Sequence, residues 1–283
     1  MNNMFWSVKF FLDEILLMLI NTFFSMINFL NFFYKNKTHL KENVIWRNKY
    51  SGQKGFLVAN GPSISKQDLS LLKNHLCFFV NQSYKHPKYS EISPDYHVFI
   101  DEKLASGVWD IECLDYIFKL NPNVTFILNS KWYKNKKFSK FKNNKKYKII
   151  WIDCRKVVHK FLKKSSIDLT KICPSISVTG AAFSTMIYMG FRKINLVGQD
   201  GNGLCYELVG KKTHFYGENY ENKNKTIKEI HKDLNQMSLS IKQWINYSKF
   251  CERNNIKVKN CTEGGIFEMF ERNSLVSETL KDK

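Results

Sequence analysis

Short apolar runs alternate with segments of helical spacing along most of this 283-residue chain, and this alternation restricts the fold more than any other feature. The apolar runs typical of strands cover 56–60, 77–81, 97–101, 124–129, 148–153, 193–200 and 257–261. Helical spacing is found in 65–74, 108–120, 179–189 and 226–254. Strands separated by helices form βαβ units, so the sequence predicts an α/β fold with a doubly wound, mostly parallel, Rossmann-like sheet.

The first 36 residues differ from the rest, because positions 15–34 carry no charged side chain. The polar residues in this region recur at spacings that place them on one helical face: Glu14, Asn21, Ser25, Asn28 and Lys35. This pattern favours an N-terminal amphipathic helix in a membrane interface over a spanning helix. Packing on the catalytic domain or in an oligomer interface is the alternative, and a span stays open. A signal peptide fits poorly, since acidic residues interrupt its start.

Charge and cysteine usage restrict the partners and the compartment. The net charge is +19, which indicates anionic partners such as a membrane surface, a nucleotide phosphate or an acidic glycan. Zinc-finger, helix-turn-helix and RNA-binding signatures are missing, so no nucleic-acid partner is expected. The seven cysteines form no C-x-x-C pair, which indicates reduced thiols in the cytoplasm and no zinc site.

We expect three regions: a membrane-associated helix over 1–36, a polar linker over 37–54 and a catalytic domain over 55–283. Within the domain, 131–148 is rich in lysine with interleaved aromatic residues. This segment is either a solvated surface or a basic patch that faces lipid or an anionic acceptor.

Asn60-Gly61-Pro62-Ser63 follows directly after the first apolar run of the expected domain. A glycine after a strand lets backbone N–H groups approach a phosphate closely, and Asn60 and Ser63 add side-chain hydrogen bonds. The carboxyl edge of an open α/β sheet is where nucleotides bind. The tetrapeptide therefore predicts a nucleotide-binding turn, although an ordinary turn has the same composition.

Polar residues also end other expected strands. Asn81 and Gln82 follow the second, Asp101 closes the third, and Asp200 closes the strand at 193–200. Because the carboxyl ends of parallel strands meet at one edge, we expect these side chains to converge on one ligand crevice. Capping is the alternative role for each one singly, and Asp200 suits a turn equally well.

Ser177-Val178-Thr179-Gly180 leads into the expected helix at 179–189. The amino end of a helix has unsatisfied N–H groups, so Ser177, Thr179 and Gly180 form a second candidate anion site. The alternative is that Thr179 acts only as the N-cap of this helix.

His214, in the segment Thr213-His214-Phe215-Tyr216-Gly217, is the candidate general base. Imidazole titrates near neutral pH and accepts a proton from a hydroxyl, and the lysines just before this segment disfavour its charged form. Tyr206 lies between Asp200 and this loop and is a candidate donor to a departing phosphate.

These motifs, in this order over roughly residues 55–220, resemble the family 42 glycosyltransferases, bacterial sialyltransferases that use CMP-sialic acid. The resemblance implies nucleotide or donor contacts for Asn60, Gly61, Ser63, Asn81, Thr179 and Gly180. It implies that Tyr206 assists the departing phosphate and that His214 is the general base. The chain departs from the family at Asp101, where the family has asparagine, and near Asn202, where the family has a tyrosine. It has no clear match for the donor-contacting arginine.

A second resemblance is to the hydroxymethylpterin-pyrophosphokinase-like group, which includes proteins of surface-glycan clusters. It is carried by Pro94-Asp95-Tyr96, by Met189-Gly190-Phe191 and by the segment 260–265. The two groups resemble each other in fold, so this resemblance supports the fold more than the substrate.

The combined hypothesis is an inverting glycosyltransferase that moves a sialic-acid-like sugar from a CMP donor to a surface-glycan or lipid-linked acceptor. It would act peripherally at the cytoplasmic face of the inner membrane and require no cofactor, and both magnesium binding and a homo-oligomer stay open. One alternative is a pyrophosphokinase-like phosphotransferase, for which Asp101 and Asp200 would bind magnesium. The other is a non-catalytic glycan-assembly protein.

Overall fold

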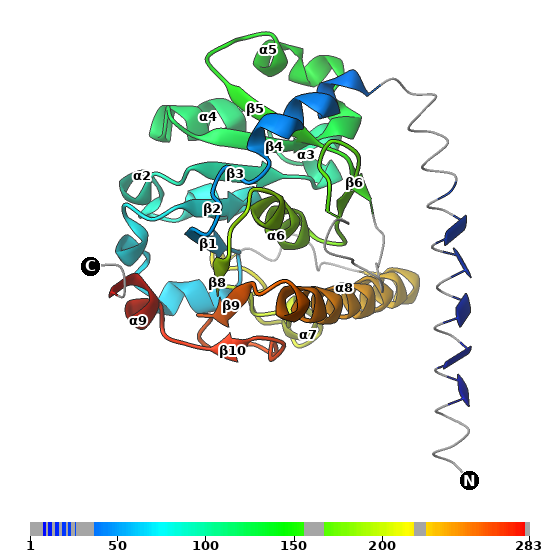
Figure 1. Ribbon diagram of the computed structural model, residues 1–283. Coiled ribbons are helices and arrows are strands. Elements are labelled where there is room, and N and C mark those ends of the chain that lie inside the picture. The colour runs from blue at the N-terminus through cyan, green and yellow to red at the C-terminus, as the bar shows by residue number, and fades with distance from the viewer. Residues whose placement is uncertain are drawn as a thin grey trace.

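The computed structural model describes residues 37–155, 167–217 and 225–280, together with helical positions between 8 and 26. Within these residues, eight strands form one sheet in the order β10-β9-β8-β1-β2-β3-β4-β5 (Figure 1). Its strands are β1 (Lys54–Val58), β2 (Cys77–Val80), β3 (Tyr96–Phe99), β4 (Thr125–Asn129), β5 (Lys148–Ile152), β8 (Lys193–Val197), β9 (Lys257–Asn260) and β10 (Glu271–Arg272). A separate pair joins β6 (Cys154–Arg155) to β7 (Cys173–Pro174).

Every neighbouring pair in the large sheet is parallel, which confirms the predicted fold class. The chain adds β2 to β5 on one side of β1 and then returns to place β8 on the other side. The strand order therefore reverses between β1 and β8. Open α/β sheets bind ligands in the crevice outside the carboxyl ends of the strands at such a point.

Helices and short 3₁₀ turns connect the strands. The α-helices are α2 (Tyr89–Ile92), α3 (Glu102–Ser106), α4 (Cys113–Leu120), α5 (Ser139–Lys142), α6 (Val178–Tyr188), α7 (Gly203–Leu208), α8 (Ile227–Arg253) and α9 (Leu275–Leu280). The 3₁₀ segments are η1 (Thr38–Trp46), η2 (Pro62–Lys66), η3 (Leu69–Leu72), η4 (Asn81–Lys85), η5 (Ser130–Trp132) and η6 (Lys136–Phe138). Helix α8 begins at a capping box between Thr226 and Glu229, close to its predicted start.

The helix expected over 65–74 is absent from the described residues, where η2 and η3 take its place. Gln67 between them has an extended backbone, with φ −107° and ψ 140°. The carboxylate of Asp68 then accepts the N–H of Ser70, so it starts a new turn instead of continuing a helix.

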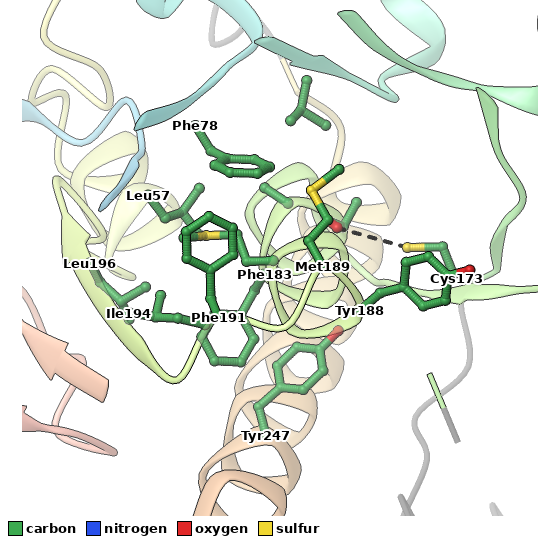
Figure 2. Packing of buried hydrophobic residues seen from close by; sticks show 14 of the residues in the cluster. Leu57, Phe78, Cys173, Phe183, Tyr188, Met189, Phe191, Ile194, Leu196 and Tyr247 are labelled. Atoms are coloured by element: carbon green, nitrogen blue, oxygen red, sulfur yellow. Dashed lines mark hydrogen bonds between the residues drawn. The ribbon is translucent and has the colours of Figure 1, made fainter. Parts of the chain in front are cut away.

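Alternate side chains of the strands face opposite sides of the sheet, and both sides are covered. Leu57 and Phe78 point to the face packed by α6 and α8, where Phe183 and Tyr247 lie (Figure 2). The residues beside them in the chain face the side covered by η3, α4 and α9. The domain thus has three layers. Because both faces of the sheet are buried, the strand sequences are continuous apolar runs and do not alternate with polar residues.

Residues 37–54 do not form the expected linker. Leu40 on η1 is fully buried, and the Asn43 amide donates hydrogen bonds to the carbonyls of Trp151 and Leu169, each 2.8 Å long. Lys37 forms an ion pair with buried Asp153 at 2.5 Å. The segment is part of the folded domain, because its side chains pack and form hydrogen bonds with residues of that domain.

The lysine-rich segment 131–148 folds with its aromatic side chains inward. Trp132, Phe138, Phe141 and Tyr147 are all buried, and Trp132 stacks on Phe138 with ring centroids 5.1 Å apart. The solvated surface and the basic patch that faces lipid or an anionic acceptor both stay compatible with this packing, because the lysines of the segment are exposed. Burying large rings stabilises the fold, while the lysines stay at the surface.

The described positions between 8 and 26 are helical and carry exposed apolar side chains. Leu12, Leu16, Leu19, Phe23 and Met26, spaced three or four residues apart, are each more than half exposed. Among the described residues, no helix combines the length and apolar character that crossing a membrane requires.

Candidate active site at the carboxyl edge of the sheet

The turns that follow β1 and β8 lie directly against each other at the point where the strand order reverses. Ala59 donates its N–H to the carbonyl of Val197 at 2.8 Å, and Gly61 donates to the carbonyl of Gly198 at 2.9 Å. These bonds continue the β1–β8 pairing beyond the strands. The predicted nucleotide turn therefore has a fixed position at the switch point.

Gly61 occupies a space that no larger residue fits. A Cβ atom at this position would lie 1.7 Å from Oδ2 of Asp200 and 2.5 Å from the carbonyl oxygen of Gly198. Pro62 follows as the first residue of η2, where its missing N–H costs no helical hydrogen bond. The close approach of backbone to carboxylate explains why this sequence has glycine in the turn.

Ser63 and Asp200 join the two turns through their side chains. The Ser63 hydroxyl donates to Oδ2 of Asp200 at 2.7 Å, and only about 5% of Asp200 is exposed. Burial raises the pKa of this carboxyl group, and the hydrogen bonds from Ser63 oppose that shift. Asp200 therefore organises the turn after β1, a role that its strand-end position alone did not reveal.

Asn60 connects three separate segments. Its side-chain amide donates to the carbonyl of Val80 at the end of β2, at 3.2 Å, and its own carbonyl accepts the N–H of Phe215 at 3.2 Å. Only 8% of Asn60 is exposed, and its Oδ1 is buried without a hydrogen-bond donor among the described residues. An acceptor left open in this way is a candidate ligand contact.

The hydrogen bond from Phe215 brings the His214 loop to the nucleotide turn, as predicted. His214 is half-buried and stacks on Tyr216 with ring centroids 5.0 Å apart. The ammonium of Lys85 lies 5.1 Å from the Tyr216 ring centroid, so a cation is close to this loop. The loop is anchored at both the turn and η4, and the catalytic role of His214 stays a prediction.

Tyr206 is less directly connected. It lies half-buried on α7, and its N–H bonds to the carbonyl of Asn202 within that helix. Among the described residues, its side chain forms no hydrogen bond with the cluster of Asn60, Ser63 and Asp200. The structure therefore leaves its proposed contact with a departing phosphate as a prediction.

A cavity of about 450 Å³ lies at the tips of β2, β3 and β4. Three predicted site residues line it, namely Asn81, Asp101 and Ser177. The Asn60 amide donates to the carbonyl of Val80, the residue before Asn81, so the cavity adjoins the switch point. The carboxyl edge thus carries one continuous row of candidate ligand contacts.

Asn81 is held in an unusual conformation by a buried histidine. Its φ is +47°, in the left-handed region, and its carbonyl accepts a 2.7 Å hydrogen bond from Nε2 of His97. Nδ1 of His97 faces the Tyr89 hydroxyl at 2.8 Å, so the neutral ring donates at Nε2 and accepts at Nδ1. The Asn81 Oδ1 is buried without a partner among the described residues. Sequence reasoning missed His97, which lies within an apolar run.

Burial lowers the pKa of His97 to about 3, against 6.5 for an ordinary histidine. A folded pKa below the unfolded value means that the unfolded chain binds the proton more strongly. The contribution of His97 to the free energy of unfolding should therefore be fully present above pH 6.5 and fall by about 1.4 kcal/mol per pH unit between 6.5 and 3. Urea denaturation at several pH values measures this slope. Replacement of His97 by glutamine should reduce it, and an unchanged slope would contradict the assignment.

Asp101 and Ser177 are both helix caps. Asp101 accepts the N–H of Lys103 at 3.0 Å and begins α3, while Ser177 accepts the N–H of Gly180 at 3.2 Å and begins α6. The N-cap of α6 is thus Ser177, and the expected capping role of Thr179 is wrong. The Thr179 hydroxyl instead lies 3.1 Å from that of Ser177. Gln82, the remaining predicted residue, is buried.

Two glutamines of α8 hold the loop before α6. Gln236 donates to the carbonyl of Ile176 at 3.1 Å, and the side-chain oxygen of Gln243 accepts the Ile176 N–H at 2.8 Å. Their spacing of seven places them on one helical face, but only the fold reveals their target. Asn129, which lines the cavity, ends β4 and could have been found by the same strand-end argument as Asp101.

Asp101 and Asp200 follow strands that are not neighbours. β1 and β2 lie between β8 and β3, so the two strand ends are separated by about 14 Å at the usual strand spacing. A single magnesium ion binds its ligands at about 2.1 Å, so the strand order alone does not bring these two carboxylates to one ion. Among the described residues, no group of three or more histidine, cysteine or acidic side chains has the geometry to hold a metal.

Two glycosyltransferases are among the solved structures that superpose on this chain. The MAf glycosyltransferase from Magnetospirillum magneticum AMB-1 superposes with a TM-score of 0.49 at 13% identity, over 81% of this chain and 35% of that protein. This chain therefore corresponds to only part of that longer protein. The sialyltransferase CstII from Campylobacter jejuni, solved with CMP-3FNeuAc, superposes with a TM-score of 0.44 at 16% identity, over 78% of this chain and 85% of CstII. Curated protein sequences give no match.

A family model described as 6-hydroxymethylpterin diphosphokinase MptE-like matches residues 27–207, which is more than half of the chain. The match includes Pro94-Asp95-Tyr96 and Met189-Gly190-Phe191, two segments on which the second resemblance rested. It ends before the His214 loop and before 260–265. The chain belongs to the 6-hydroxymethylpterin diphosphokinase MptE-like family.

Proposed function

We propose that this protein is an inverting glycosyltransferase that uses a CMP-activated acid sugar and a glycan or lipid-linked acceptor. The observation that carries this proposal is the hydrogen bond from Phe215 to the carbonyl of Asn60. It anchors the loop of the candidate base beside the candidate nucleotide turn. A base next to a phosphate site suits a reaction in which an acceptor hydroxyl displaces a nucleotide.

The donor would lie along the carboxyl edge. Backbone N–H groups at the turn after β1 and the amino end of α6 suit a phosphate. The unpartnered acceptor atoms of Asn60 and Asn81 suit the hydroxyl and amino donors of a nucleoside. His214 would take the proton of the acceptor hydroxyl, whose oxygen then attacks the anomeric carbon while CMP leaves with the bonding electrons. Tyr206 would donate to the departing phosphate.

The family match favours a second candidate, a diphosphokinase that transfers a diphosphate from a nucleoside triphosphate. Such a reaction depends on magnesium to neutralise the phosphates. The strands before Asp101 and Asp200 are not neighbours in the sheet, which argues against these two carboxylates as the magnesium ligands of a diphosphokinase. The two candidates differ in nucleotide preference and in metal dependence.

Thermal unfolding in the presence of nucleotides separates these candidates. A ligand that binds only the folded state raises stability by RT ln(1 + [L]/Kd), which is about 2.7 kcal/mol at one hundred times Kd. We expect CMP to raise the melting temperature more than UDP, GDP or ATP, with the same shift in excess EDTA. A shift only with ATP and magnesium would instead support the diphosphokinase.

We also propose peripheral attachment to the cytoplasmic face of the inner membrane through the N-terminal helix. Support comes from the exposed apolar stripe that includes Leu16, Leu19 and Phe23, and from the net charge of +19. Replacing these three residues by serine should abolish co-sedimentation with vesicles that contain phosphatidylglycerol. The control replaces Val44 and Ile45, two exposed apolar residues of η1, by serine. Equal loss in both variants would contradict this attachment.

A further inference from the structure

A second cavity lies at the opposite edge of the sheet, where the strands begin. Its volume is about 510 Å³. Its lining includes Gln53, Lys54, Lys73, Asn74, His75 and Lys193. The length of β1 separates it from the turn after Val58 by about 13 Å, at the usual rise per residue. We name it the lysine cavity, and none of its residues belongs to the candidate active site.

The strand register places lysines side by side at this edge. Lys54 of β1 lies opposite Lys193 of β8, which lies opposite Lys257 of β9. Phe56 lies two residues after Lys54, and Val197 lies four residues after Lys193, so each shares a side of the sheet with its lysine. Phe56 and Val197 belong to the same buried cluster, and the side chains of Lys54 and Lys193 therefore lie on one side of the sheet. Like charges at directly opposed positions repel each other and destabilise the sheet.

Protein groups compensate only part of this charge. Lys54 donates to the backbone carbonyl of Glu278, a buried residue of α9. Lys73 and Lys193 have no acidic partner in the part of the chain that the structure describes, and no acidic residue is among those that line the cavity. Two carboxylates line an adjoining cavity of about 350 Å³.

Those two carboxylates are already engaged. Glu91 pairs with Lys88 at 2.9 Å, and Asp95 accepts the N–H of Cys77 at 2.9 Å. They leave the charge of the lysine cavity to be balanced from outside the protein. The cavity is also much larger than a single anion of the size of phosphate requires.

We propose that the lysine cavity binds the diphosphate group of a ligand. Lys73 and Lys193 supply the cationic contacts, because ammonium groups bind phosphate oxygens as point charges. The side-chain amides of Gln53 and Asn74 supply further donors. The ligand is either a free diphosphate or the diphosphate head group of a lipid. This site is separate from the proposed glycosyltransferase site and does not depend on it.

Calorimetric titration of the full chain with inorganic pyrophosphate, in low salt, tests the site. Lys73→Gln combined with Lys193→Gln should weaken binding about tenfold or more, because each lost charged contact is substantial. The matched control combines Lys119→Gln with Lys232→Gln, which remove the same charge from exposed positions on α4 and α8. It should leave the affinity within about twofold, since distant surface charges are screened.

Phosphatidylcholine vesicles with and without a prenyl diphosphate test the lipid source. If the lipid is the ligand, the prenyl diphosphate should increase binding of the wild-type chain and of the control, but not of the Lys73/Lys193 variant. Equal weakening in both double variants, or no diphosphate binding in either assay, would overturn the proposal. Loss of pyrophosphate binding when CMP is added would overturn it too, by placing the anion at the switch point. A chain that binds no CMP at all would refute only the proposed function.

Discussion

Gly61→Ala will abolish nucleotide binding and destabilise the folded chain. Its Cβ would lie 1.7 Å from Oδ2 of Asp200 and 2.5 Å from a backbone carbonyl, so the turns after β1 and β8 must separate. Overpacking of this kind costs about 1–3 kcal/mol, and the separation would also break the bond between Ser63 and Asp200. Urea denaturation measures the loss of stability, and calorimetry with CMP measures the loss of binding.

Gly203→Ala is the matched control for this change. A Cβ atom at Gly203, the first residue of α7, would meet no other atom within 4 Å. Alanine in an open helical position is neutral or slightly stabilising. If Gly61→Ala binds CMP as tightly as Gly203→Ala does, the tight packing of the turn is not what forms the nucleotide site.

His214→Ala is expected to lower the rate of transfer by a factor of about 10² to 10⁴, which is the usual contribution of a general base. The ring is half-buried and stacks on Tyr216, so its removal should leave the fold intact. CMP binding should be retained, because the contact between this loop and Asn60 is made by the backbone of Phe215. The measurement is single-turnover transfer of a labelled acid sugar, together with a CMP titration.

The control for this variant is His231→Ala, which removes an exposed histidine from α8. It should transfer the sugar at the wild-type rate. A His214→Ala protein that binds CMP and transfers at the same rate would reject the base. A His214→Ala protein that keeps its fold and its full biological effect would instead support the non-catalytic glycan-assembly role.

The strand-end argument placed several polar residues along one edge of the sheet, and the structure brings them to that edge. Asn60, Asn81 and Asp101 follow apolar runs that became β1, β2 and β3, within two residues of the expected ends. Parallel strands whose two faces are buried produce continuous apolar runs, and polar residues then mark where burial ends. For this reason the fold class and the row of candidate ligand contacts could be predicted from the sequence.

Sequence patterns were less informative where a segment has two compatible local structures. Helical spacing over 65–74 predicted a helix, but the local hydrogen bond of Asp68 to Ser70 starts a separate turn. The lysines and aromatic residues that alternate over 131–148 suggested a solvated surface or a basic patch, and only tertiary packing showed that Trp132, Phe138, Phe141 and Tyr147 are buried. In both segments the local composition was compatible with two structures, and the composition alone did not decide between them.

The sequence by itself determined the alternation of strands and helices, the edge at which the polar turns gather and the excess of positive charge. Only the tertiary structure decided that Asp200 holds Ser63, that His97 holds the backbone of Asn81 and that Lys54 and Lys193 are neighbours. Periodicity is a local property, set by the geometry of a single strand or helix. The contacts of Asp200 with Ser63 and of Lys54 with Lys193 join residues more than a hundred positions apart and depend on strand order, which no local pattern encodes.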